Sequence, residues 1–212
     1  MALTTEAYFD HLKACLHPEY LLDPDGKGNL QLKERGEGGV IVREVSFNFE
    51  GEAFCVNLDL PSPVLTKADR KKGEKPAPPR LFRFLDDEAK PWGKKCDFVV
   101  FHRLPVGIYA YLIEFKSNGI DAVSIKSQLD SSLNWLKCLQ RIVEHYYGHT
   151  CKLSVQKFVF SSNTNPAQYL DRSGKYLKAD PAIRFYNYDD LKPLSLGDLE
   201  NKMIDEIQGG AA

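Results

Sequence analysis

The strongest constraint on the fold is an apolar run at residues 108–117, IYAYLIEFKS, which is followed closely by the longest helical pattern in the chain, at 121–147. Aromatic and β-branched residues dominate the first run, as in a strand. In the second, apolar residues such as Ile125, Leu129 and Val143 recur at helical spacing, and Gly148 is placed to end the helix. A strand that leads into a long helix predicts an α/β fold in which the helix covers a mixed sheet.

Other segments supply a first helix and the remaining strands. Thr4 or Thr5 can cap a helix that runs to about Leu16, and HPEYLLDPDGKGN after it is expected to be loop. Five more strands are predicted in GGVIVREVSFNF, EAFCVNLDL, CDFVVF, KLSVQKFVFSS and AIRFYNYDDL. We expect the first two of these to pair as a hairpin across EGE. The predicted order is one helix, four strands, the long helix and two strands.

The chain is expected to form a single domain over residues 1–212, with an unusual segment at 61–80. There, PSPVLTKADRKKGEKPAPPR has little to bury, so we predict a mobile basic, Pro-rich surface loop, whose simplest role is a solvated linker. From Lys67 to Arg103, however, eleven Lys and Arg stand against six Asp and Glu. This excess makes four lysines candidates to bind a phosphate backbone: Lys71, Lys72, Lys94 and Lys95.

Composition excludes several classes of protein. The formal net charge is −1, so any binding of nucleic acid must depend on a local basic patch. The five cysteines are scattered, which argues against a disulfide framework. The first residues lack the pattern of a signal peptide, and no apolar run approaches the roughly 18 residues of a membrane span. We therefore expect a cytoplasmic protein that does not insert into a membrane.

The predicted strand at 108–117 ends with two opposite charges on one face. Side chains alternate along a strand, so Glu114 and Lys116 continue the apolar row of Ile108, Ala110 and Leu112. Asp97 opens the preceding apolar run, and a hairpin between the two strands would bring it close to Glu114. Two carboxylates suit Mg²⁺, which prefers oxygen ligands, and a nearby lysine can stabilise negative charge on a phosphate.

The pattern [DE]-x-K has little meaning without its context. It occurs six times in this chain, at Asp25, Asp69, Glu88, Glu114, Asp190 and Glu200. Only at Glu114 does it end an apolar strand, follow a strand that opens with Asp, and precede a long amphipathic helix. The prediction of a site therefore depends on this context.

KKCDFVVF, YLIEFKSNG and the helix that follows resemble the core of the PD-(D/E)XK nuclease superfamily, over about residues 94–160. The resemblance implies a restriction-endonuclease-like fold, with a mixed central sheet flanked by helices, and Mg²⁺- or Mn²⁺-dependent cleavage of nucleic acid, DNA rather than RNA. Asp97 and Glu114, with the carbonyl of Phe115, would hold the metal, and Lys116 would assist the attack. A homodimer or a partner subunit is expected, in phage defence or mobile-element biology.

Three further positions can be compared with the pattern of this superfamily. Cys96 stands where the motif often has proline. Gln128 matches the glutamine that RecB-like members carry on the helix after the lysine, but Ser132 replaces their tyrosine one turn later. Glu6 is the candidate for the glutamate that many members carry on their first helix. Gln128 is therefore included among the candidate site residues.

Three alternatives remain open. The charges of Asp97, Glu114 and Lys116 can form an ordinary structural ion pair, although buried charges are costly without partners. The fold can also serve as a non-catalytic module that binds nucleic acid or protein. Finally, Cys138, His145, His149 and Cys151 lie close enough in sequence for a zinc site, although their spacing matches no tight zinc signature.

Overall fold

The computed structural model describes residues 4–35, 41–59, 91–117, 119–148, 151–192 and 194–208. The basic loop predicted at 61–80 lies outside these ranges, as do Lys71, Lys72 and His149. Over the described residues, a seven-stranded mixed sheet has the order β1-β4-β5-β6-β7-β8, with β9 beside β7, and β2 and β3 form a separate two-stranded sheet. The prediction of a mixed α/β fold is thus confirmed.

The helices and strands follow one another along the chain in this order: α1 (Thr5–Ala14), β1 (Leu21–Leu22), β2 (Leu30–Arg35), β3 (Ile41–Phe47), β4 (Glu52–Asn57), β5 (Phe98–Leu104), β6 (Gly107–Lys116), α2 (Ala122–Tyr147), β7 (Leu153–Ser161), β8 (Ile183–Asn187), α3 (Tyr188–Leu191) and β9 (Asp205–Ile207). Short 3-10 turns lie at Pro18–Tyr20, Pro91–Gly93 and Leu196–Asp198.

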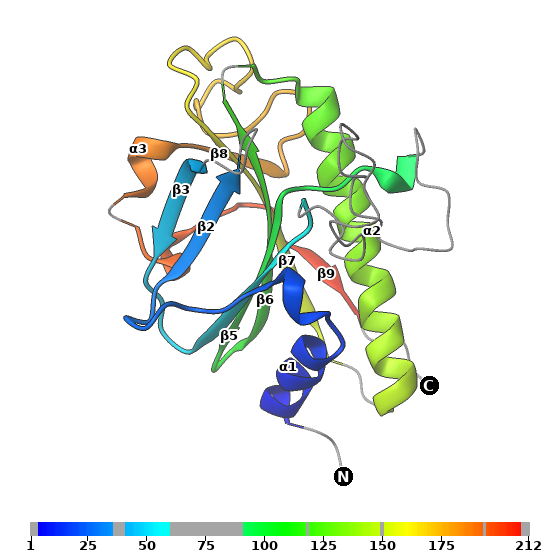
Figure 1. The fold of residues 1–212 in the computed structure, drawn as a ribbon. Coiled ribbons are helices and arrows are strands. Elements are labelled where there is room, and N and C mark those ends of the chain that lie inside the picture. The colour runs from blue at the N-terminus through cyan, green and yellow to red at the C-terminus, as the bar shows by residue number, and fades with distance from the viewer. Residues whose placement is uncertain are drawn as a thin grey trace, which may run out of the picture.

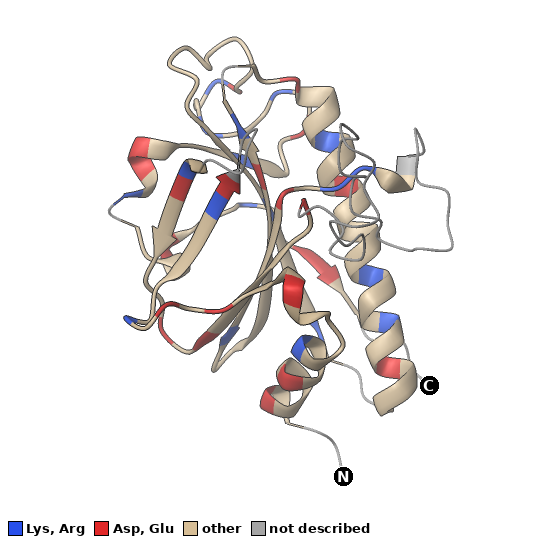
Figure 2. Ribbon diagram, in the orientation of Figure 1, with Lys and Arg blue, Asp and Glu red and all other residues tan. Residues whose placement is uncertain are grey.

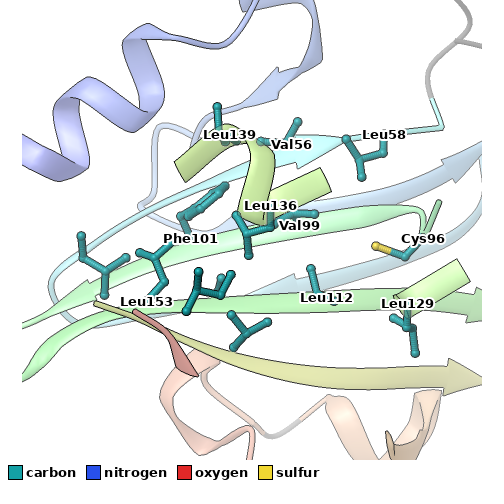
Figure 3. Packing of buried hydrophobic residues seen from close by; sticks show 14 of the residues in the cluster. Val56, Leu58, Cys96, Val99, Phe101, Leu112, Leu129, Leu136, Leu139 and Leu153 are labelled. Atoms are coloured by element: carbon teal, nitrogen blue, oxygen red, sulfur yellow. The ribbon is translucent and has the colours of Figure 1, made fainter. Parts of the chain in front are cut away.

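The large sheet separates two hydrophobic cores. Figure 1 shows α1 and α2 on one side of the sheet and β2, β3 and α3 on the other. Apolar side chains of α2 such as Leu129 and Leu136 pack on Val99 and Leu112 of the sheet, as Figure 3 shows. The opposite core contains Leu32 and Phe47 of the small sheet together with aromatic residues of β6 and β7.

Local signals explain both ends of α2. The side chain of Asp121 accepts hydrogen bonds from the backbone N–H groups of Val123 and Ser124, which satisfies two of the free donors of the first turn. At the other end, Gly148 adopts a left-handed conformation with φ 67°, which glycine tolerates without steric cost. The predicted helix and its terminator are therefore confirmed.

Strand β6 lies at the centre of the large sheet. It pairs antiparallel with β5, so that Phe98 lies opposite Ile113, and parallel with β7 on its other side. The parallel connection runs through α2, as parallel neighbours require. The carboxyl end of β6 and the start of β5 therefore meet at one edge of the sheet, beneath the first turns of α2.

The predicted hairpin between 38–49 and 52–60 is wrong. Strand β3 pairs with β2, and β4 pairs with β1 and β5, so the two strands belong to different sheets. Between them, Gly51 has φ 80° and lies so close to the carbonyl of Arg103 that a side chain would collide with it. The alternation of apolar residues identified both strands, but it did not identify their partners.

Other elements were missed or misjudged. Strand β1 lies in the expected loop, and β2 and β9 were not predicted at all. The predicted strand AIRFYNYDDL ends at Asn187, whose side chain accepts the N–H of Asp189 and begins α3. The two residues of β1 and the three of β9 carry too little periodicity to be recognised in sequence, whereas β2, with six residues, was overlooked.

Candidate functional site

The carboxyl end of β6 places two opposite charges on one face of the strand, as predicted, and the structure shows that this face lies toward α2. Glu114 continues the buried row of Ala110 and Leu112 and is only 1% exposed. Its Oε1 forms an ion pair with Nζ of Lys116, which is half-buried. The other carboxylate oxygen, Oε2, is buried and has no hydrogen-bond partner among the described residues. A buried carboxylate with one oxygen unsatisfied is costly, which calls for a further partner.

Asp97 lies beside Glu114 because β5 and β6 form the antiparallel pair that the sequence predicted. It immediately precedes Phe98, whose partner in the register is Ile113. Its Oδ2 accepts the backbone N–H of Phe115 at 2.6 Å. This hydrogen bond holds the Asp97 carboxyl between the strands, next to Glu114.

Side chains of helix α2 form hydrogen bonds that hold the residues around these carboxylates in place. Nζ of Lys116 donates to Oε1 of Gln128 at 3.4 Å, and Nε2 of Gln128 donates to the carbonyl of Lys95 at 3.2 Å. One turn further along, Oγ of Ser132 accepts the backbone N–H of Cys96 at 2.7 Å. Two side chains of one helix therefore hold the two residues that precede Asp97.

Burial dominates the electrostatics of this cluster. It raises the pKa of Glu114 to about 7, because desolvation outweighs the stabilisation that Lys116 and Gln128 give to the anion. Desolvation also raises the pKa of Asp97 well above its ordinary value, and the negative charge of Glu114 raises it further. Such shifted carboxyls, paired at the end of a sheet, are typical of functional sites.

The donor set fits a hard divalent cation. Asp97 and Glu114 offer carboxylate oxygens, one of them without a partner, and Mg²⁺ is commonly held by one or two carboxylates with several waters. Phe115, whose carbonyl is the third predicted ligand, lies between Glu114 and Lys116 in the same strand. Within the described ranges, no group of three or more His, Cys, Asp or Glu side chains could hold a metal ion by itself. Any ion at this position therefore needs water or substrate to complete its ligands.

Sequence reasoning missed a third carboxylate. Asp59 follows β4, and the N–H of its neighbour Leu58 donates to the carbonyl of Asp97 at 2.9 Å. The negative charge of Asp59 raises the pKa of both Asp97 and Glu114, and its own pKa is raised by partial desolvation and by Glu34. The available signal was its position, since Asp59 ends an apolar strand next to the strand that Asp97 opens.

Tyr188 is a second residue that the sequence did not indicate. Its ring meets that of Phe115 edge-on, with centroids 5.5 Å apart, and its hydroxyl is buried without a partner among the residues that the structure describes. Burial raises the pKa of this hydroxyl, and the positive charge of Arg43 offsets only part of this rise. The hydroxyl therefore stays neutral. Nothing in the sequence separates Tyr188 from the other tyrosines.

The remaining predicted residues divide into two groups. Lys94 is exposed just before the site, and the charge of Lys95 lowers the pKa of Asp59, so both lie at its margin. Glu6, by contrast, lies on the exposed side of α1 and interacts with Arg103, at the far end of β5 from Asp97. The structure therefore does not bring Glu6 to the site. Cys138 is exposed and Cys151 half-buried, both as free thiols.

In the part of the chain that the structure describes, lysine and arginine are not concentrated on one element. Figure 2 shows them spread over the small sheet, α2 and the connecting segments, with Asp and Glu between them. Among the described residues, no helix has the length and apolar content to cross a membrane. In comparisons with protein-family models, with curated proteins and with solved structures, nothing matches this chain.

Proposed function

We propose that this protein is a metal-dependent nuclease of the PD-(D/E)XK type, with a restriction-endonuclease-like core. The observation that carries the proposal is the convergence of Asp97, Glu114, Lys116 and Gln128 at one edge of the sheet, with Oε2 of Glu114 buried and unpartnered. An ordinary ion pair accounts for Glu114 and Lys116, but it leaves that oxygen and the neighbouring Asp97 unexplained.

Each residue has a definite role in this proposal. Asp97, Glu114 and the carbonyl of Phe115 would hold Mg²⁺ or Mn²⁺, which supplies charge neutralisation at the scissile phosphate and an activated water. Lys116, held by Gln128, directs its ammonium group toward the same place and stabilises negative charge that develops on the phosphate.

Lysines near these residues would hold the nucleic acid. Lys94 and Lys95, which lie at the margin of the site, would contact phosphates, as would Lys71 and Lys72. We propose DNA rather than RNA as substrate, a cytoplasmic role in phage defence or mobile-element biology, and action as a homodimer or with a partner subunit.

The test compares cleavage of plasmid DNA, linear duplex DNA, single-stranded DNA and RNA, each with Mg²⁺, Mn²⁺ or EDTA. Cleavage that requires metal and is lost in Asp97→Ala and Lys116→Ala is the expected result, with a fall of at least about a hundredfold for each variant. The matched control is Lys27→Ala, because Asp25 and Lys27 form the same short pattern in an exposed turn. Cleavage that survives in both site variants would refute the proposed roles.

A second measurement separates catalysis from binding alone. Calorimetric titration with Mn²⁺ is expected to show binding that Asp97→Ala abolishes. Metal binding without cleavage of any substrate would favour the non-catalytic module on the same fold. If neither metal binding nor cleavage is found, the nuclease proposal fails.

A further inference from the structure

A groove lies on the face of the large sheet opposite α2, around the turn between β5 and β6. It consists of two adjoining pockets of about 450 and 590 Å³, both lined by Leu104 and Gly197. Tyr109, Tyr111 and Tyr176 give the first pocket aromatic walls. Because β6 runs from Gly107 to Lys116, this groove lies at the opposite end of the strand from Glu114, and on the other face.

A buried carboxamide without a partner lies in the first pocket. Gln156 of β7 is only 6% exposed, and it neighbours Tyr111 in the sheet register. Its Oε1 is buried and accepts no hydrogen bond from the described residues. Natural proteins rarely leave such an acceptor unsatisfied. A ligand that supplies a hydrogen-bond donor would relieve this cost.

The neighbouring polar groups also offer acceptors. Nε2 of His102 bonds to the carbonyl of Glu50 at 2.7 Å, so this nitrogen carries the hydrogen. Burial lowers the pKa of His102, so the ring is neutral and Nδ1 can only accept. The Tyr111 hydroxyl, 3.4 Å from Nδ1, therefore directs its hydrogen toward His102 and presents only lone pairs to the groove.

Negative charge predominates along the groove. Among the described residues that line it, Glu50, Asp198 and Glu200 stand against Lys202, and the guanidinium of Arg184 lies 5.3 Å from the ring centroid of Tyr176. Glu50 and Glu200 are exposed and form no ion pair with any residue that the structure describes. The ammonium of Lys202 lies 3.8 Å from the ring centroid of Tyr176, so this aromatic wall already holds one aliphatic ammonium group.

We infer that this groove binds an extended organic cation with aliphatic ammonium groups. One ammonium would donate to Gln156 between the tyrosine rings, and another would lie near Glu50 and Asp198 in the adjoining pocket. A free polyamine and a lysine-rich peptide share this chemistry. The inference does not depend on the nuclease proposal, because no residue of the groove belongs to the carboxylate site.

The test is calorimetric titration of the full chain at low ionic strength, without divalent metal. The ligands are spermidine, an end-blocked trilysine peptide and an end-blocked triglutamine peptide as the neutral control. One or both cations are expected to bind at one site per chain, and triglutamine is not. Binding of spermidine alone identifies a small polyamine, and binding of trilysine alone identifies a basic peptide.

Three variants locate the binding. Glu50→Gln and Glu200→Gln, both at exposed positions that tolerate substitution, should each weaken binding roughly two- to fivefold. Gln156→Leu should weaken it further, and Asp97→Asn should leave it unchanged. The matched control is Glu6→Gln, which removes an equal charge outside the groove. The inference is overturned if neither cation binds, or if Glu6→Gln weakens binding as much as the groove variants.

Discussion

Glu114 is a carboxyl whose burial outweighs its ion pair. Lys116 favours the anion, yet the pKa lies near 7 rather than at the ordinary 4.5, because almost no water reaches the group. Such a displacement corresponds to about 3 kcal/mol between the protonated and ionised forms. At neutral pH the folded chain therefore carries the cost of a partly ionised buried acid, as is common where function requires one.

This cost predicts how stability depends on pH. In the folded state the pKa of Glu114 is raised, so its contribution to stability is fully present below about pH 4.5 and is lost as the pH rises through about 7. Glu114→Gln removes the ionisation, so this variant should gain up to about 3 kcal/mol relative to the natural chain at pH 8.5, and little at pH 4.5. Urea unfolding at the two pH values measures the difference. An equal effect at both values would contradict the pKa shift.

A second prediction concerns the metal and rests on the proposed function. Because a cation must displace protons from Glu114 and Asp97, Mn²⁺ affinity should rise by about tenfold per pH unit per displaced proton up to pH 7, and then more slowly. Titrations between pH 5.5 and 8.5 in the absence of nucleic acid measure this slope. An affinity that does not change with pH would place the metal elsewhere.

How far the sequence predicted the site depends on the type of contact. Glu114 and Lys116 were predictable because a strand alternates faces, and Asp97 because the next strand folds back on the first. Tyr188 contacts Phe115 only because α3, which follows β8 of the large sheet, packs on the far face of that sheet, and no local pattern encodes this packing. Asp59 is an intermediate case, because the strand that it ends was predicted but the pairing of that strand with β5 was not.

At the scale of elements, α2 both packs on the sheet and holds part of its backbone by hydrogen bonds. Its apolar face covers the sheet, while Gln128 and Ser132, four residues apart on the same side of the helix, hold the backbone of Lys95 and Cys96. The position of Asp97 thus depends on a helix that begins more than twenty residues later. The sequence predicted the helix and named Gln128, but it gave Ser132 no role.

The hydrogen bond that Ser132 accepts predicts a loss of stability in Ser132→Ala. Removal of Oγ leaves the buried N–H of Cys96 without its acceptor, which should destabilise the fold by about 1–3 kcal/mol. Ser127→Ala on the same helix is the control and should change stability by less than about 0.5 kcal/mol. Urea denaturation measures both. If Ser132→Ala is as stable as the control, the hydrogen bond does not hold the strand.

The error in the predicted hairpin also arises at the scale of elements. β3 and β4 were recognised because each has the composition of a strand, but pairing depends on which surfaces are free when the chain collapses. β4 is buried on both faces and fits only inside the large sheet, between β1 and β5. β3, with alternating exposed and buried residues, suits a small sheet that covers the core on one face.

At the scale of the whole molecule, the two cores are joined by the final segment of the chain. Leu196 and Leu199 are buried in the core beneath the small sheet, and Ile207 of β9 is buried in the core beneath α2. Between them, Nδ2 of Asn201 donates to the carbonyls of Lys157 at 2.9 Å and Ala182 at 2.8 Å, so it links β7 to the start of β8. Sequence patterns did not indicate this role, because its apolar residues are few and widely spaced.

The final segment should therefore be required for folding. Removal of residues 193–212 deletes the buried side chains of Leu196, Leu199 and Ile207. Burial of each of these side chains stabilises the fold by about 1.5–3 kcal/mol. The sum, roughly 5–9 kcal/mol, is comparable to the entire stability of an ordinary domain. We expect this truncated chain to lose its cooperative thermal transition, as followed by circular dichroism, whereas removal of 209–212 alone should preserve it. If the shorter chain melts cooperatively near the temperature of the full chain, the two cores are stable without the segment that joins them.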